Sequence, residues 1–351
     1  MSSPKNFEYS FFSKAFHRIV LTSNDLQKSL FSLERFLFLK IRNIKKNTQS
    51  LFITGLARSG STILLNSLYN TGNFASLKYS DMPFIVCPNI WSKISSINIK
   101  KNLKKKTRAH DDGIEFDLQS PEAFEEIFWR SQLDLKLDEK DIYEQKDIEN
   151  EIIKNFENFL QLVTIKEKKN IYLSKNNNNI LRLDTLKNKL SNKKIIILFR
   201  NPLHHSYSLL KQHNNFCNIQ KINPFVLEYM NLLSHNEFGI NHKPLFFSEF
   251  KSNYENNNIN YWLDYWIFIY SKLSKYINNK NDFIFLSFES MKLNPVKILK
   301  KIVNNFDIKF ELNNIQIFNK DEPRIDLEID NEKLKIAKNL YKFLINSEIK
   351  P

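Results

Sequence analysis

Apolar and polar positions follow two different periods along this chain of 351 residues. Short, nearly continuous apolar runs predict buried strands at "SLFITGL", "NIYLSK", "KKIIILFR" and "DFIFLSFE", with a shorter strand at "NFASLKY". Apolar residues at helical spacing predict helices over residues 60–72, 179–190, 202–213, 222–236, 256–278, 295–305 and 331–346. Strands that alternate with helices indicate an α/β fold, in which helices cover both faces of a parallel sheet.

The alternation divides the chain into three parts. We predict an N-terminal helical segment over residues 1–48, an α/β domain over 49–310, and a C-terminal loop and helix over 311–351. Within the domain, residues 133–168 are acidic and then mixed in charge, with apolar residues at helical spacing. This stretch is therefore predicted to be a helical insertion that faces solvent.

Two further stretches carry local signals. Prolines interrupt "SDMPFIVCPNIWSKI", which is therefore predicted to be a loop. Ser120, Pro121 and Glu122 have the order of a helix start, with a capping serine, proline at the first position and an acid near the helix dipole.

The N-terminal stretch "LQKSLFSLERFLFLKIRN" has the spacing of an amphipathic helix and contains too many charges to span a membrane. Packing on the main domain is the favoured interpretation, and peripheral contact with a membrane is the alternative. No secretory signal is visible, and two cysteines, Cys87 and Cys217, cannot form a disulfide framework. A reducing, cytoplasmic location is expected.

The net charge of +14 raises the question of an anionic partner. Much of the excess is lysine in segments that are also rich in asparagine and isoleucine, and no nucleic-acid-binding motif accompanies it. We therefore expect no nucleic acid partner. A small anionic molecule or a glycan suits the same surface.

The stretch "ITGLARSGSTILLNSL" has the outline of a P-loop, because four residues separate Gly55 from Gly60 and Ser61 and Thr62 follow. The lysine of a nucleotide triphosphate loop is missing. Backbone N–H groups from Ser59 onward would still bind an anion at the start of a helix, with Arg58 adding positive charge.

A second anion site is predicted at the end of "KKIIILFR", where Arg200 opens a helix that carries Ser208 two turns later. Two such sites on neighbouring strands suit a ligand with separated phosphate-like groups, such as 3′-phosphoadenosine-5′-phosphosulfate (PAPS). A kinase would need a carboxylate for Mg²⁺ at a strand end, and only Glu289 could supply it. A small-molecule kinase and a non-catalytic nucleotide-binding module remain the alternatives.

These motifs resemble the sulfotransferase superfamily over residues 51–306. The stretch "ARSGSTILL" is similar to its 5′-phosphosulfate loop, and "FRNPLHHSYSLL" is similar to its 3′-phosphate element. "LSFESMKLNPVKILKKIVNNF" resembles the segment near the end of its domain, and "YLSKNNNNILRLDTL" the lysine-bearing strand end of its tyrosylprotein and carbohydrate branches. Further stretches, including "SHNEFG", look like a bacterial branch.

The resemblance implies a PAPS-dependent sulfotransferase with a P-loop-type α/β domain. It assigns cofactor binding to a set of loop and helix residues, namely Arg58, Ser59, Gly60, Ser61, Thr62, Arg200 and Ser208. It also places Lys175 near the transferred sulfuryl group, and "KDEPRID" is a poor match to the nucleotide-clamping loop of the cytosolic branch.

The chemistry needs positively charged side chains beside the leaving phosphate and a base that removes the proton of the acceptor. Arg58 and Lys175 supply the charge without a metal, and the histidines match no known spacing of metal ligands. Asp81 is the first candidate base, because an acid occupies this position in the tyrosylprotein branch. His110, Asp111 and Asp112 are second candidates. Small-molecule, glycan, lipid and tyrosine acceptors all remain open.

Overall fold

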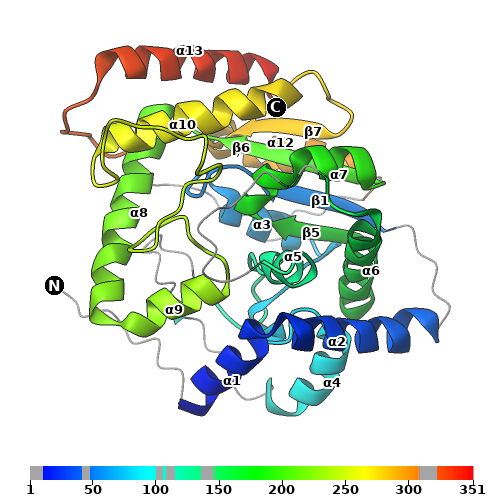
Figure 1. Cartoon of the computed structure of the whole chain (residues 1–351). Coiled ribbons are helices and arrows are strands. Elements are labelled where there is room, and N and C mark those ends of the chain that lie inside the picture. Colours follow the sequence, from blue (N-terminus) through cyan, green and yellow to red (C-terminus); the bar gives the residue numbers. More distant parts are fainter. Residues whose placement is uncertain are drawn as a thin grey trace.

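The structure is a computed structural model that describes residues 11–41, 48–99, 106–107, 115–135, 145, 147–306, 308 and 322–350. Its centre is a parallel sheet of five strands in the order β2-β5-β1-β6-β7 (Figure 1). The strands are β1 (Gln49–Thr54), β2 (Phe74–Ala75), β5 (Ile171–Lys175), β6 (Lys193–Phe199) and β7 (Phe283–Ser287). The predicted α/β class and all five predicted strands are confirmed.

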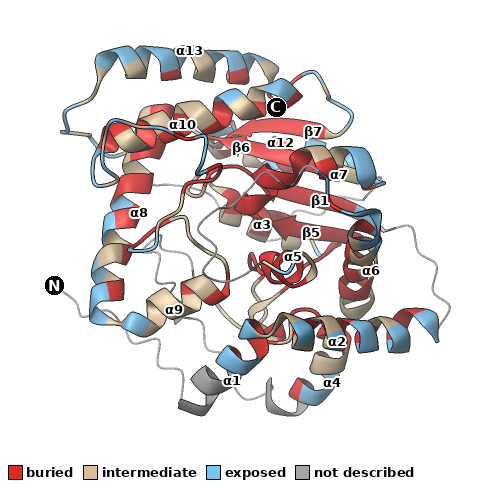
Figure 2. Cartoon of the chain, viewed as in Figure 1, coloured by how far each residue is buried: buried red, intermediate tan, exposed pale blue. Residues whose placement is uncertain are grey.

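Both faces of the sheet are buried, as the continuous apolar runs predict (Figure 2). In β1, Leu51 and Ile53 join one hydrophobic cluster and Phe52 joins the other. The first face is covered by α3 (Ser61–Tyr69), α11 (Phe288–Leu293) and α12 (Pro295–Val303). The second is covered by α5 (Glu126–Gln132), α6 (Asn150–Glu167), α7 (Leu183–Lys189), α8 (Pro202–Ile222), α10 (Ile259–Leu273) and α13 (Asn331–Ser347).

The connections that follow two neighbouring central strands, β1 and β6, run to opposite faces of the sheet. The chain leaves β1 into α3 on one face, and it leaves the adjacent β6 into α8 on the opposite face. The two connections therefore separate at the carboxyl ends of β1 and β6. In open α/β sheets this divergence forms the crevice in which ligands bind.

Two local predictions are wrong. The proline-rich stretch predicted as a loop contains α4 (Pro88–Ile99). The helix can begin at Pro88 because Glu34, distant in sequence, accepts hydrogen bonds from the N–H groups of Asn89 (2.6 Å) and Ile90 (3.0 Å). The helix predicted to start at Pro121 begins five residues later, at Glu126, because Pro121 forms a β-bridge with Lys78.

The predicted insertion over residues 133–168 is, where the structure describes it, a core helix. The prediction that this stretch faces solvent is wrong for α6, because Ile153, Phe156 and Phe159 are buried against the sheet and its flanking helices. The boundaries of the three predicted parts of the chain stay a prediction.

The N-terminal helices are α1 (Phe11–Thr22) and α2 (Asn24–Arg35), followed by a π-helical turn over Phe36–Lys40. Phe31 of α2 packs edge-on against Phe128, with ring centroids 5.5 Å apart, so α2 packs on the main domain as predicted. Peripheral membrane contact stays a prediction. Within the described ranges, no helix has the length and apolar content to cross a bilayer.

After α8 the chain forms α9 (Pro224–Leu232), and a long connection then leads from α9 to α10. In Figure 1 this connection passes over the carboxyl ends of the strands. It therefore lies close to the crevice.

Candidate active site

Two glycines shape the loop that joins β1 to α3. Gly55 has a φ of 138°, and a Cβ atom there would lie 2.3 Å from the carbonyl oxygen of Leu198 in β6. Gly60 has a φ of 95° and caps the N-terminus of α3. Glycine is required at both positions, because an L-residue with this backbone would be strained and the first would also clash with β6.

The start of α3 offers hydrogen-bond donors to an anion. Ser61 and Thr62 lie in the first turn, where backbone N–H groups have no carbonyl acceptor within the helix. The Ser59 hydroxyl is fully buried, and its Oγ has no hydrogen-bond partner among the described residues. The loop and the helix dipole therefore favour negative charge at this point.

Arg58 joins this loop to the element that follows β6. Its Nε donates to the hydroxyl of Ser208 on α8 at 3.3 Å, and its carbonyl oxygen accepts a long hydrogen bond of 3.5 Å from Arg200 Nη1. Arg58 itself has a φ of 68°, a conformation that is uncommon for a residue other than glycine. The structure thus brings together Arg58, Arg200 and Ser208 in the crevice between β1 and β6.

Arg200 already binds a carboxylate of the same chain. Its Nη2 donates to both oxygens of Glu322, at 2.9 Å and 2.7 Å, and the guanidinium stacks on Phe288 at 4.7 Å from the ring centroid. Nε of Arg200 is buried and has no partner in the described part of the chain. Glu322 is one of the three acids of "KDEPRID", and no local pattern predicts that it meets Arg200.

Glu289 has a structural position at this edge of the sheet. Its Oε1 accepts from the N–H of Asn201 at 2.9 Å, and its Oε2 accepts from the hydroxyl of Tyr341 at 2.9 Å. Both oxygens are therefore engaged in holding the start of α8 against α13. The kinase alternative required this carboxylate for Mg²⁺.

His205 on α8 holds the loop between β1 and α3 in place. The side chain is fully buried, and its Nε2 lies 2.8 Å from the carbonyl oxygen of Ala57. Burial lowers the pKa of His205 to about 3, so the imidazole is neutral at physiological pH and donates its Nε2 proton to that carbonyl. The sequence analysis had found only that the histidines match no spacing of metal ligands.

Lys175 is the last residue of β5 and is 9% exposed. Its Cα pairs with Ile53 in the adjacent β1, and the next N–H, that of Asn176, donates to the Ile53 carbonyl at 3.0 Å. Because parallel strands end at the same edge, Lys175 emerges beside the loop that carries Arg58. The role of Lys175 near the transferred group stays a prediction.

The asparagine run after Lys175 is a structural device that the sequence analysis missed. All four side-chain amides donate hydrogen bonds to acceptors outside the run. Asn176 binds Glu126 (2.8 Å), Asn177 binds Glu237 (3.0 Å), Asn178 binds the Ser234 carbonyl (3.3 Å) and Asn179 binds Glu125 (3.0 Å). The strand end that bears Lys175 is therefore held by carboxylates from α5 and by the connection between α9 and α10.

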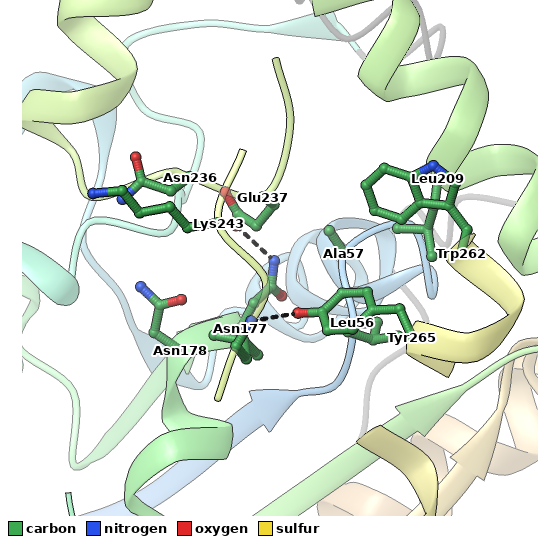
Figure 3. A pocket seen from close by; sticks show the side chains of 11 residues that line it. Leu56, Ala57, Asn177, Asn178, Leu209, Asn236, Glu237, Lys243, Trp262 and Tyr265 are labelled. Atoms are coloured by element: carbon green, nitrogen blue, oxygen red, sulfur yellow. Dashed lines mark hydrogen bonds between the residues drawn. The ribbon is translucent and has the colours of Figure 1, made fainter. Parts of the chain in front are cut away.

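A pocket adjoins the loop on the side of these asparagines (Figure 3). It is formed by the β1 loop, the turn after β5, the connection between α9 and α10, and one face each of α8 and α10. The lining residues are Leu56, Ala57, Asn177, Asn178, Leu209, Asn236, Glu237, Lys243, Leu245, Trp262 and Tyr265. Arg200 is not among the residues that line the pocket.

Asp81 lies in a different environment from these residues. Both of its carboxylate oxygens accept from Lys166 Nζ at 2.6 Å, and one also accepts from the Lys78 N–H at 2.9 Å. Lys166 also pairs with Glu167, which accepts from Tyr69 at the C-terminus of α3. Since α3 has nine residues and is about 13 Å long, Asp81 is associated with the end of this helix opposite to the loop. Its role as the base stays a prediction.

The second candidate bases, His110, Asp111 and Asp112, lie outside the described residues. Within the described ranges, no group of three or more histidine, cysteine, aspartate or glutamate side chains could hold a metal ion.

Comparison with known proteins addresses the predicted resemblance directly. The sequence profile of the sulfotransferase family matches residues 50–311, which is most of the chain and includes every described residue of the crevice up to β7. The chain belongs to the sulfotransferase family. It is accordingly an enzyme of the sulfotransferase type, as the motifs predict. No curated protein sequence matches this sulfotransferase.

Two solved structures are similar in arrangement to this sulfotransferase. One is sulfotransferase STF1 from Mycobacterium tuberculosis H37Rv, at 10% sequence identity and a TM-score of 0.45, covering 92% of this chain and 79% of that one. The other is sulfotransferase STF9 from Mycobacterium avium, also at 10% identity, with a TM-score of 0.46 and coverage of 97% and 79%.

Proposed function

We propose that this sulfotransferase transfers the sulfuryl group of PAPS to a hydroxyl or amine acceptor, in line and without a metal. The observation that carries the proposal is the meeting of Arg58 and Arg200 in the crevice between β1 and β6. Two cationic side chains from two strand ends suit a ligand that has one anionic group on each side of a nucleoside.

The residues present fit such a ligand. Ser59 Oγ in the β1 loop, Arg200 Nε, and Ser206 Oγ on α8 are buried without hydrogen-bond partners among the described residues. Buried polar atoms are normally paired, so unpaired ones in both elements are what a missing anion would leave. The β1 loop and the start of α3 would hold the 5′-phosphosulfate, and Arg200 with Ser208 would hold the 3′-phosphate.

The chemistry in this proposal is transition-state electrostatics. PAPS supplies a sulfuryl group on a good leaving phosphate. Arg58, Lys175 and the N–H groups of Ser61 and Thr62 stabilise the charge that grows on the leaving oxygen. An acceptor held in line on the far side of the sulfur needs only a positioned base to remove its proton.

Ligand preference tests this proposal. Calorimetry with adenosine 3′,5′-bisphosphate (PAP) should show saturable binding that is the same in EDTA and in Mg²⁺, because side chains and N–H groups do the work of a metal. ATP should bind more weakly under both conditions. Metal-dependent binding of ATP together with no response to PAP would instead support the small-molecule kinase.

The ion pair between Glu322 and Arg200 leads to a second prediction for the same site. Its carboxylate occupies Nη2 of Arg200, a donor that the 3′-phosphate would need, so the phosphate must displace it. The Glu322→Gln variant should bind PAP about 2- to 10-fold more tightly, because a partly exposed ion pair is worth on the order of 1 kcal/mol. AMP, which lacks the 3′-phosphate, should bind both proteins equally. A gain for both nucleotides, or for neither, would contradict competition at Arg200.

A further inference from the structure

The pocket beside the β1 loop contains one carboxylate in a setting that suits proton transfer. Of the described residues that line this pocket, Glu237 is the only acidic residue and Lys243 is the only residue with a cationic side chain. Figure 3 shows Glu237 and Asn177 directed toward each other, with a hydrogen bond between them. The pocket shares Leu56 and Ala57 with the loop that ends at Arg58 and Gly60. An acceptor in it would therefore lie beside the proposed phosphosulfate site.

Only one of the two oxygens of Glu237 is engaged. Oε1 accepts from Asn177 Nδ2 at 3.0 Å, and Oε2 has no donor within the described part of the chain. Asn177 follows Lys175 by two residues, so this hydrogen bond connects the carboxylate to the strand end that carries the proposed catalytic lysine. The arrangement orients Glu237 and leaves one oxygen available to a ligand.

The wall that carries Glu237 is rigidly held. Gly239 has a φ of 89°, and its N–H donates to His213 Nδ1 at 3.3 Å. The next N–H, that of Ile240, donates to Gln220 Oε1 at 2.7 Å, and the Leu245 N–H donates to the Tyr265 hydroxyl at 2.9 Å. These bonds fix the connection between α9 and α10 to α8 and α10, which preorganises the carboxylate.

Two other buried acids close to the strand ends, and the more distant Asp81, are committed to structural partners. Glu126 forms a bidentate ion pair with Arg182, at 2.7 Å and 2.8 Å. Glu125 accepts from several buried donors, including Ser174 Oγ at 2.6 Å and Tyr172 OH at 3.0 Å. Asp81 is bound by Lys166. Releasing any of these would leave a buried cation or donor unpaired, which is costly.

We propose that Glu237 is the general base of the transfer reaction and that this pocket, which has room for about one water molecule or hydroxyl group, receives the reacting hydroxyl of a small neutral acceptor, such as a sugar, whose remainder lies outside it. This inference rests on the proposed function. The acceptor oxygen forms a bond to sulfur while the bond from sulfur to the 5′-phosphate oxygen breaks. The electron pair leaves with that phosphate oxygen, and the acceptor proton passes to Oε2 of Glu237.

The class of acceptor follows from what the lining residues can recognise. The side-chain amides of Asn177, Asn178 and Asn236 can donate to and accept from hydroxyl groups. Leu209 and Leu245 add apolar surface for a carbon skeleton. With one acid and one base the lining carries no net charge, so a neutral molecule enters without leaving a charge uncompensated.

Glu237→Gln tests the base, with Glu249→Gln as the matched control because Glu249 pairs with Lys272 on the surface of the same connection. In one assay, the purified proteins are incubated with ³⁵S-labelled PAPS and glucose, N-acetylglucosamine or myo-inositol. In a second assay no acceptor is added, so that water in the pocket is the acceptor and labelled sulfate is released. Glu237→Gln should lower transfer and sulfate release by about 10²- to 10⁴-fold, the usual contribution of a positioned base. PAP affinity, measured by calorimetry, should change less than about 3-fold, since Glu237 lies outside the crevice of Arg200.

The outcomes separate the two proposals. Wild-type protein that does not bind PAP would refute the proposed function, whatever Glu237 does. PAP binding with transfer and sulfate release unaffected by Glu237→Gln would overturn Glu237 as the base, and if Asp81→Asn then abolished both, Asp81 would be the base that the sequence predicts. Labelling of glucuronate or a tyrosine peptide, with none of the three neutral compounds labelled, would overturn the acceptor class.

Discussion

Replacing Lys175 with alanine should lower the rate constant of sulfuryl transfer by about two to three orders of magnitude. Lys175 ends β5 next to the β1 loop, where the leaving oxygen of a bound phosphosulfate would lie. Charge on that oxygen develops only in the transition state, so a cation there contributes mainly to kcat and little to ground-state binding. Single-turnover kinetics with labelled PAPS should show the loss, while PAP affinity by calorimetry falls less than about 5-fold.

Two variants control this experiment. Lys175→Arg keeps the charge and should recover part of the rate, whereas a lysine needed only for packing would not be rescued by a larger cation. Lys194→Ala removes a lysine from the amino-terminal end of β6, a strand separated from β5 by β1, where its ammonium binds the Asn281 carbonyl. It should leave transfer unchanged. Equal losses of rate and PAP affinity in Lys175→Ala would mean that Lys175 binds the ground state and has no specific catalytic role.

The sheet was predictable from the sequence because the residues that specify each strand are adjacent in the sequence. Each strand has an uninterrupted apolar run, as in β6, which is the signature of a strand buried on both faces. The two glycines of the β1 loop are equally readable, because the positive φ at Gly60 and the close approach of Gly55 to Leu198 exclude other residues. Loop and strand ends together were enough to predict that Arg58, Lys175 and Arg200 lie at the same edge of the sheet.

The errors arise where a partner distant in sequence decides the local structure. The prolines near Pro88 indicated a loop, but the carboxylate of Glu34 satisfies the first N–H groups of α4 and stabilises a helix there. Pro121 looked like a helix start, but pairing with Lys78 keeps it extended. No local pattern identifies such partners.

The same reason explains what the sequence missed in the site. The hydrogen bond between Asn177 and Glu237 joins residues 60 positions apart, and the ion pair between Arg200 and Glu322 joins residues 122 positions apart. The amides of the asparagine run likewise bind acceptors that are distant in sequence. For Asp81, the sequence gives a position after a short strand but not the direction in which the chain turns, and the ion pair with Lys166 depends on that direction.

Replacing Arg200 with alanine should weaken PAP binding by about 30- to 150-fold, because a charge-assisted contact to a phosphate is worth on the order of 2 to 3 kcal/mol. AMP, which lacks the 3′-phosphate, should lose less than about 3-fold. The comparison of the two nucleotides by calorimetry therefore isolates the contact to the 3′-phosphate from any general damage to the crevice.

Glu322 determines the necessary control. Once Arg200 is removed, the carboxylate that it bound is left near the site and would repel the phosphate, which adds to the apparent loss. The double variant Arg200→Ala with Glu322→Gln removes this repulsion, so its loss of PAP affinity reports the missing guanidinium alone. Arg200→Lys keeps a charge but loses the forked geometry and the stacking on Phe288, and should fall between wild type and Arg200→Ala. Equal weakening of PAP and AMP in the double variant would show that Arg200 maintains the shape of the crevice and does not contact the 3′-phosphate.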